Sequence, residues 1–187
     1  MAKLEDTRKE IDNIDNELKE LLMKRLDCSL AAAMAKHEAG SLDVFRADRE
    51  AEVLERLSAD VADDRKPEYL AMVSKIMEAS RMYQYDLLYD WNENAFETVT
   101  GHEKANIESM CVIVRFNRKN APNALGAILT MVGDHGFNMR RVELAENTPE
   151  TTAFELEIKG DVREKRMRKL LFQLSRETSD FKIIGCY

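Results

Sequence analysis

The sequence predicts two domains of different class, an all-α N-terminal domain and an α+β C-terminal domain. In the first 90 residues apolar side chains recur at helical spacing, and no proline occurs before Pro67. Residues 92–106 lose this periodicity. Beyond them, short β-rich segments alternate with two amphipathic helical segments. We therefore expect a helical domain at residues 1–91, a linker at 92–106 and a second domain at 107–187.

The composition is that of a globular protein, with 44% hydrophobic and 34% charged residues among 187. Residues 1–92 contain 14 Lys and Arg against 21 Asp and Glu, whereas residues 93–187 contain 14 of each. Because neither half is basic, we expect neither nucleic acid nor a membrane as a partner. The charged stretch "MAKLEDTRKE" and three scattered cysteines predict a cytoplasmic protein without a disulfide or metal site.

The first predicted helix covers residues 5–39, since no glycine or proline occurs before Gly40. With a rise of about 1.5 Å per residue, this helix would be roughly 50 Å long, which exceeds the width of a small three-helix domain. One chain cannot cover an apolar stripe of that length. We therefore expect a second copy to pack along it, in an intertwined homodimer.

Two shorter helices complete the predicted N-terminal domain, at residues 44–60 and 67–90. Pro67 suits the first turn of the third helix, where a missing backbone N–H costs nothing. All three segments carry an apolar stripe, so we expect them to pack together.

The C-terminal half predicts four strands and two helices in the order β-α-β-β-α-β, a ferredoxin-like arrangement. The helix within residues 120–138 follows a turn and stops at Gly136. The stretches "MRRVELAE" and "TTAFELEIKG" alternate apolar and polar residues, which is typical of half-buried strands. The remaining predicted elements are a strand at 109–117, a helix at 162–177 and a strand at 181–187.

Several polar residues fall on faces of the N-terminal helices that should be apolar. Arg25 and Lys36 lie within roughly 20° of each other, near the centre of the stripe of the first helix. Arg8 lies about 100° round the same helix from Arg25, where it can reach a different cavity. The inward-facing set comprises Arg25, Lys36, Arg49, Glu50, Ser80 and Gln84.

This set predicts a binding site for a small anion. A single such arginine usually pairs with a carboxylate or extends its head group to water. Three cations against one carboxylate instead leave excess buried charge, which costs several kcal/mol per unpaired ion. Arginine and lysine donors suit a dicarboxylate with an ether or carbonyl oxygen. Since no histidine, thiolate or metal cluster accompanies them, catalysis would be electrostatic and conformational rather than covalent.

Four stretches distributed over the three helices are together similar to one enzyme family. They are "TRKEIDNIDNELKELLMKR", "AMAKHEAG", "DREAEVLERL" and "IMEASRMYQ". Residues 4–90 thereby resemble the all-helical AroQ-type chorismate mutases. The resemblance implies conversion of chorismate to prephenate, a step of phenylalanine and tyrosine biosynthesis. That reaction is a unimolecular [3,3]-sigmatropic rearrangement and needs no cofactor.

The resemblance also implies roles for individual residues. It implies that the substrate carboxylates are bound by Arg25, by Arg49 and by Arg8 of a partner chain. Lys36 and Gln84 would contact the ether oxygen. Glu50 and Ser80 would contact the ring hydroxyl and a further carboxylate oxygen.

One position departs from the family. Where many members have aspartate near the substrate hydroxyl, the stretch "FRADRE" has Arg46. We therefore expect the contact with the hydroxyl to differ in detail here.

The stretches "APNALGAILTMVGDHGFNM" and "FKIIGCY" make residues 107–187 similar to ACT domains, which bind amino acids. The resemblance implies an aromatic amino acid as effector. "VELAEN" stands where dehydratase-linked ACT domains have "ESRP", and Asn123 replaces a glycine, a change that asparagine tolerates because it enters left-handed conformations. The effector-binding residues implied are Asn120, Asn123, Ala124, Leu125 and Glu143. The alternative is a ligand-free dimerisation module.

The chain is thus similar to the two ends of a mutase–dehydratase fusion, with a linker too short for the dehydratase. Two other functions stay open. Isochorismate–pyruvate lyases share the helical scaffold and much of the cation set. The chain is alternatively a non-enzymatic amino-acid sensor with a vestigial helical domain, although an inactive site should relax toward apolar residues.

Overall fold

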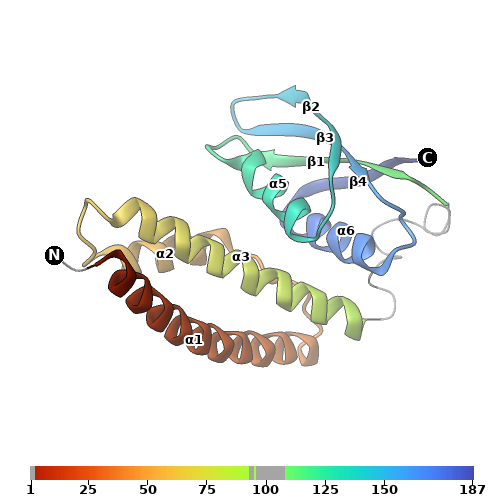
Figure 1. Ribbon diagram of the computed structural model, residues 1–187. Coiled ribbons are helices and arrows are strands. Elements are labelled where there is room, and N and C mark those ends of the chain that lie inside the picture. Colours follow the sequence, from red (N-terminus) through yellow and green to blue (C-terminus); the bar gives the residue numbers. More distant parts are fainter. Residues whose placement is uncertain (1–2, 93–94, 96–107) are drawn as a thin grey trace. The chain divides into compact units, whose positions relative to one another are not determined.

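The computed structural model describes residues 3–92, 95 and 108–187 (Figure 1). The chain divides into two compact units. The first contains residues 1–41 and 46–87, and the second contains residues 42–45 and 88–187. The predicted linker at 92–106 lies almost entirely outside the described residues, so its bounds stay a prediction.

The first unit is built from the three predicted helices, α1 (Leu4–Glu38), α2 (Ala47–Ser58) and α3 (Lys66–Trp91). Helices α1 and α3 run in the same direction, and α2 returns in the opposite direction (Figure 1). Helix α2 begins three residues later than predicted because Arg46 is extended, and its carbonyl accepts the N–H of Glu50.

Helix α1 ends where Gly40 adopts the left-handed conformation that favours glycine, with φ of 67°. The N–H of Ser41 donates to the Lys36 carbonyl at 2.9 Å, and the N–H of Gly40 to the His37 carbonyl at 3.0 Å. This pair of bonds is a Schellman motif. It satisfies the last carbonyls of the helix and fixes the backbone of Lys36.

The first half of α1 has little apolar cover within the chain. Its large apolar side chains are between 45% and 67% exposed, and they are Leu4, Ile11, Ile14, Leu18 and Leu21. Only Ser29 and Ala33, in the second half, are buried. The apolar stripe predicted from the sequence is therefore present on the surface of this single chain.

The second unit contains a four-stranded antiparallel sheet in the order β2-β3-β1-β4. The order of elements along the chain is the one that the sequence predicts, and the unit is an α+β domain. Its elements are β1 (Cys111–Lys119), α5 (Ala124–Asp134), β2 (Met139–Asn147), β3 (Thr151–Lys159), α6 (Lys165–Glu177) and β4 (Ser179–Cys186).

The boundaries differ from prediction by two or three residues. Helix α6 begins at Lys165 rather than at 162, because Asp161 Oδ1 accepts the Arg163 N–H at 2.8 Å and holds a turn there. Strand β1 begins two residues later than predicted, and β4 begins two residues earlier.

The core of the second unit lies between one face of the sheet and the two helices. Val114 and Phe116 of β1 pair with Leu156 and Phe154 of β3, and all four belong to the core. The neighbouring residues of each strand face the opposite side, where Arg115 pairs with Glu155. This alternation leaves the open face of the sheet charged.

None of the helices in the described part of the chain is long and apolar enough to cross a membrane.

Candidate active site

One turn of α3 carries three buried polar side chains, Ser80, Arg81 and Gln84. Buried polar groups need hydrogen-bond partners, because an unsatisfied group costs about 1–3 kcal/mol. Helices α1 and α2 supply these partners here. The site therefore consists of polar contacts that join α3 to the other two helices.

Arg25 of α1 is held by α3. Its Nη1 donates to Ser80 Oγ and, at 3.3 Å, to the Ile76 carbonyl. Ser29 Oγ lies 3.3 Å from Ser80 Oγ and 3.1 Å from the Arg25 carbonyl. The guanidinium is thus directed at the polar turn of α3, as the helical spacing predicts.

Lys36 and Gln84 form the second contact between α1 and α3. Lys36 Nζ donates to Gln84 Oε1 at 2.8 Å. Gln84 Nε2 donates to the Ser80 carbonyl at 3.3 Å. Because the ammonium holds the amide oxygen, the amide group has a defined orientation, with its two hydrogens on the far side from Lys36.

The contact between α2 and α3 involves a residue that the sequence analysis missed. Arg81 Nη1 lies 2.5 and 2.6 Å from the two carboxylate oxygens of Glu50. Arg81 is only 8% exposed. A signal was present in the sequence, because Arg81 follows Met77 by four and Met77 belongs to the apolar stripe.

Arg49 does not join this set, and the prediction that it faces the core is wrong. Its side chain is 64% exposed and pairs with Glu52 at 3.2 Å. The physical reason is angular. The inward face of α2 is centred on Glu50, Val53, Leu54 and Leu57, and Arg49 lies about 100° from Glu50.

Arg8 also lies apart from the set. It is exposed, seventeen residues before Arg25, which corresponds to about 25 Å along the axis of α1. Its side chain cannot reach the turn of α3 that Arg25 contacts in the same chain. That Arg8 serves a different site stays a prediction.

Arg46 lies at the N-terminus of α2 and binds Asp48, with Nη2 to Oδ2 at 2.8 Å. The Arg46 guanidinium and the Arg49 backbone N–H lower the pKa of Asp48 to about 2. Arg46 is thus engaged with a neighbouring carboxylate at the surface.

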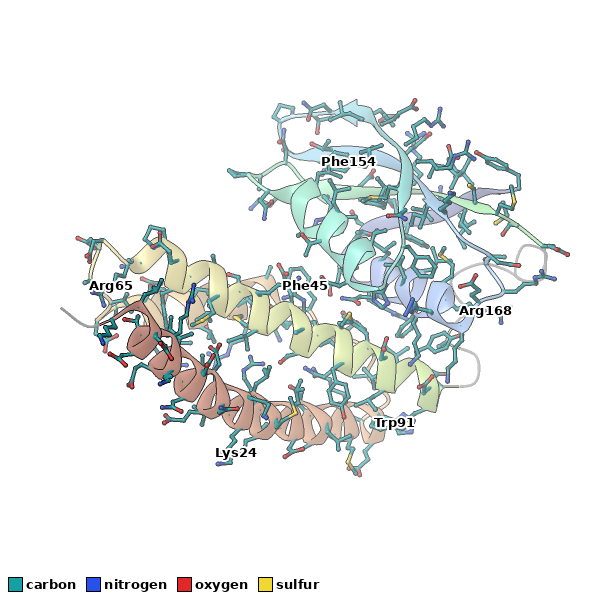
Figure 2. All side chains as sticks on the ribbon, viewed as in Figure 1. Lys24, Phe45, Arg65, Trp91, Phe154 and Arg168 are labelled. Atoms are coloured by element: carbon teal, nitrogen blue, oxygen red, sulfur yellow. The ribbon has the colours of Figure 1, made fainter. Side chains whose placement is uncertain are left out.

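A separate hollow of about 270 Å³ lies in the second unit, at the N-terminus of α5. Four of the predicted effector residues line it: Asn120, Asn123, Ala124 and Leu125. The fifth, Glu143, does not. Leu144 faces the hollow, so the strand alternation turns Glu143 to the opposite face, where it pairs with Arg141 at 3.1 Å. Phe154, labelled in Figure 2, is part of the lining.

The rim of this hollow is shaped by asparagines. Asn123 adopts the left-handed conformation, with φ of 61°, as its tolerance for that region predicts. A Cβ added at Gly126 would overlap Asn123 Oδ1, so the amide lies against the glycine. Asn120 Nδ2 donates to the Thr148 carbonyl at 2.8 Å and to Asn147 Oδ1 at 3.2 Å.

Within residues 3–92, 95 and 108–187, no group of three or more His, Cys, Asp or Glu residues could hold a metal ion. The polar turn of α3, with Arg25, Lys36 and Arg81 beside Glu50, has the composition of a site for a small anion among three helices. Which anion follows from comparison with known families.

Residues 7–85 match the family model of chorismate mutase type II. They form a chorismate mutase type II domain, and the predicted enzyme class, an intramolecular isomerase, is confirmed. The matched range contains the polar turn of α3 and its partners on α1 and α2. Neither the curated proteins nor the solved structures gave a match to the chain.

Proposed function

We propose that this protein rearranges chorismate to prephenate at the polar turn of α3, in phenylalanine and tyrosine biosynthesis. One observation carries the proposal. Arg25, Lys36 and Glu50 come from two helices, and each has its charged group in contact with the same turn of α3. Such a set suits a dicarboxylate with an ether oxygen and a hydroxyl.

In the proposed mechanism, the site selects a conformer and stabilises charge. Arg25, with Arg49 reoriented from the surface, binds the carboxylates of the folded chair-like conformer. Lys36 and Gln84 donate to the ether oxygen, on which negative charge develops as the C–O bond breaks. Stabilising that charge lowers the barrier without a nucleophile or cofactor.

We propose further that the active protein is a homodimer in which Arg8 completes the partner's site. Two features support this. The exposed apolar stripe on the first half of α1 would be buried by a second copy. Arg8 is about 25 Å along α1 from Arg25 and farther still from Lys36, so a second chain is needed to bring it to a substrate.

The second unit is proposed to be an ACT-like domain that binds an aromatic amino acid and regulates the mutase. The hollow at the N-terminus of α5 supports this, since it combines asparagine amides with Leu125 and Phe154. Amides and a helix N-terminus suit the polar end of an amino acid, and the apolar lining suits its side chain. The alternative is a dimerisation module without a ligand.

A cytoplasmic location is proposed as well. The described residues include all three cysteines, Cys28, Cys111 and Cys186, and none of them forms a disulfide, which suits a reducing compartment.

The decisive experiment follows chorismate and, in a parallel assay, isochorismate by ultraviolet absorbance, with the product identified. The chorismate assay is run alone and with phenylalanine, tyrosine or tryptophan. Prephenate is expected, at a rate that one amino acid alters. Pyruvate and salicylate from isochorismate would identify the lyase instead. A folded protein that turns over neither compound would be the non-enzymatic sensor. Prephenate formation indifferent to all three amino acids would contradict the proposed regulation alone.

A further inference from the structure

The roles proposed above leave one buried charged residue of the site without a task. Arg81 projects from the same turn of α3 as Ser80 and Gln84. Those two residues contact α1, whereas Arg81 lies about 100° round the helix from Ser80 and contacts α2. Arg81 therefore connects α2 to the polar turn of α3.

We propose that Arg81 is a positioning residue, which orients Glu50 toward the substrate hydroxyl and adjusts the charge of the site to a dianion. This inference rests on the proposed mutase function. Its basis is the contact of one guanidinium nitrogen with both Glu50 oxygens, at 2.5 and 2.6 Å.

The geometry supports the orienting role. A nitrogen that touches both oxygens lies between them and fixes the direction in which the carboxylate points. The lone pairs on the outer sides of the oxygens stay available as acceptors. The Glu50 side chain is 25% exposed and that of Arg81 only 10%, so the open side of the pair is the carboxylate.

The charges support the second role. Arg25, Lys36 and Arg81 with Glu50 have a formal net charge of +2, which balances a dicarboxylate. Without Arg81 the net charge would be +1, and the Glu50 carboxylate would repel the incoming dianion. Because the bound dianion persists through the rearrangement, this repulsion acts on substrate and transition state alike. Loss of Arg81 should therefore raise KM more than it lowers kcat.

The test compares KM and kcat on chorismate for the wild type, Arg81→Met, Glu50→Gln and the double variant. Arg81→Met is expected to raise KM about tenfold, with kcat within about threefold of wild type. The double variant should raise KM by less than the two single effects combined, because neither the Arg81 nor the Glu50 charge is then left without its partner. Arg56→Met, which removes an exposed arginine of α2, is the matched control and should leave KM unchanged.

Arg81→Gln keeps a donor for Glu50 and removes the charge, so it tests the inference if Arg81→Met fails to fold. An unchanged KM in a folded Arg81 variant would overturn the inference and leave the mutase function standing. Additive effects on KM in the double variant would also overturn the inference. So would a rise of KM in Arg56→Met equal to that in Arg81→Met. A wild type without turnover would overturn the mutase function and the inference together.

Discussion

Each unit of the molecule contains a largely buried glutamate held by arginine, and the two differ in how fully they are partnered. Glu157 of β3 accepts from the Tyr187 hydroxyl, and Arg140 Nε and Arg141 Nε lie 3.4 and 3.8 Å from its oxygens. Glu50 of α2 is held by one guanidinium nitrogen of Arg81, and Arg25 and Lys36 contact the same turn of α3.

The difference separates a structural cluster from a binding site. Around Glu157 the hydroxyl and two guanidiniums occupy the carboxylate, so the cluster has little capacity for a ligand. Near Glu50, Arg25, Lys36 and Arg81 all contact the same turn of α3, an arrangement that suits an anion. Several cations that converge on one turn therefore indicate a ligand better than a single carboxylate shared among its neighbours does.

The largest expected effect concerns Lys36, one of the cations at the polar turn of α3. Lys36→Ala should lower kcat on chorismate about 10²-fold, because a donor to the charged oxygen of the transition state is lost. Steady-state kinetics with a thermal unfolding curve measures both activity and folding. Lys24→Ala is the matched control, since Lys24 is on the exposed side of α1 (Figure 2). Near-wild-type turnover in folded Lys36→Ala would refute the mechanism.

An intermediate effect is expected at the hollow of the second unit. Gly126→Ala should displace the Asn123 amide and weaken binding of the effector about tenfold, the equivalent of one good hydrogen bond. Titration calorimetry with the amino acid that alters the mutase rate measures this. Gly133→Ala is the control on the same helix, because its added Cβ meets nothing within 4 Å. Equal affinity in both variants would show that the Asn123 amide does not contribute.

The smallest expected effect concerns the cluster of Glu157 with Tyr187, Arg140 and Arg141. The Tyr187 hydroxyl, with Arg140 and Arg141, holds the pKa of Glu157 below its usual value of 4.5 despite burial. Its stabilisation is therefore present above that value and is lost as the pH falls through the lowered pKa. Glu157→Gln should be less stable than wild type at pH 7, and the difference should shrink at an acid pH, as the pH falls through the lowered pKa of Glu157.

Urea unfolding of the wild type and Glu157→Gln at both pH values makes this comparison. Glu143→Gln, on the neighbouring strand and half exposed, controls for the loss of a surface carboxylate. A difference that persisted unchanged at acid pH would show that the ionised carboxylate is not what stabilises the cluster.

The features that the sequence predicts well are those that depend on local periodicity. The three helices, the order of strands in the second unit and the inward direction of Arg25 and Lys36 all follow from spacing along one element. The left-handed conformation of Asn123 is equally predictable from the sequence, because it depends on one side chain and its own backbone.

The features that escaped prediction depend on which face of an element meets its neighbour. The sequence predicts Arg49 on the core side, but the inward face of α2 is centred on Glu50. Glu143 was assigned to the hollow, but strand alternation puts Leu144 there. Arg81 was overlooked because its partner is on another helix, a pairing that no spacing along a single helix reveals.

The concentration of the site on one turn of α3 affects how the protein tolerates insertions. One residue inserted into α3 before Ile76 would rotate Ser80, Arg81 and Gln84 together by about 100° and break every contact of the site at once. The same insertion between Ala59 and Arg65, in the connection before α3, would leave the register of the helix intact. Length variation in this domain should therefore be confined to its connections, and α3 should vary by substitution alone.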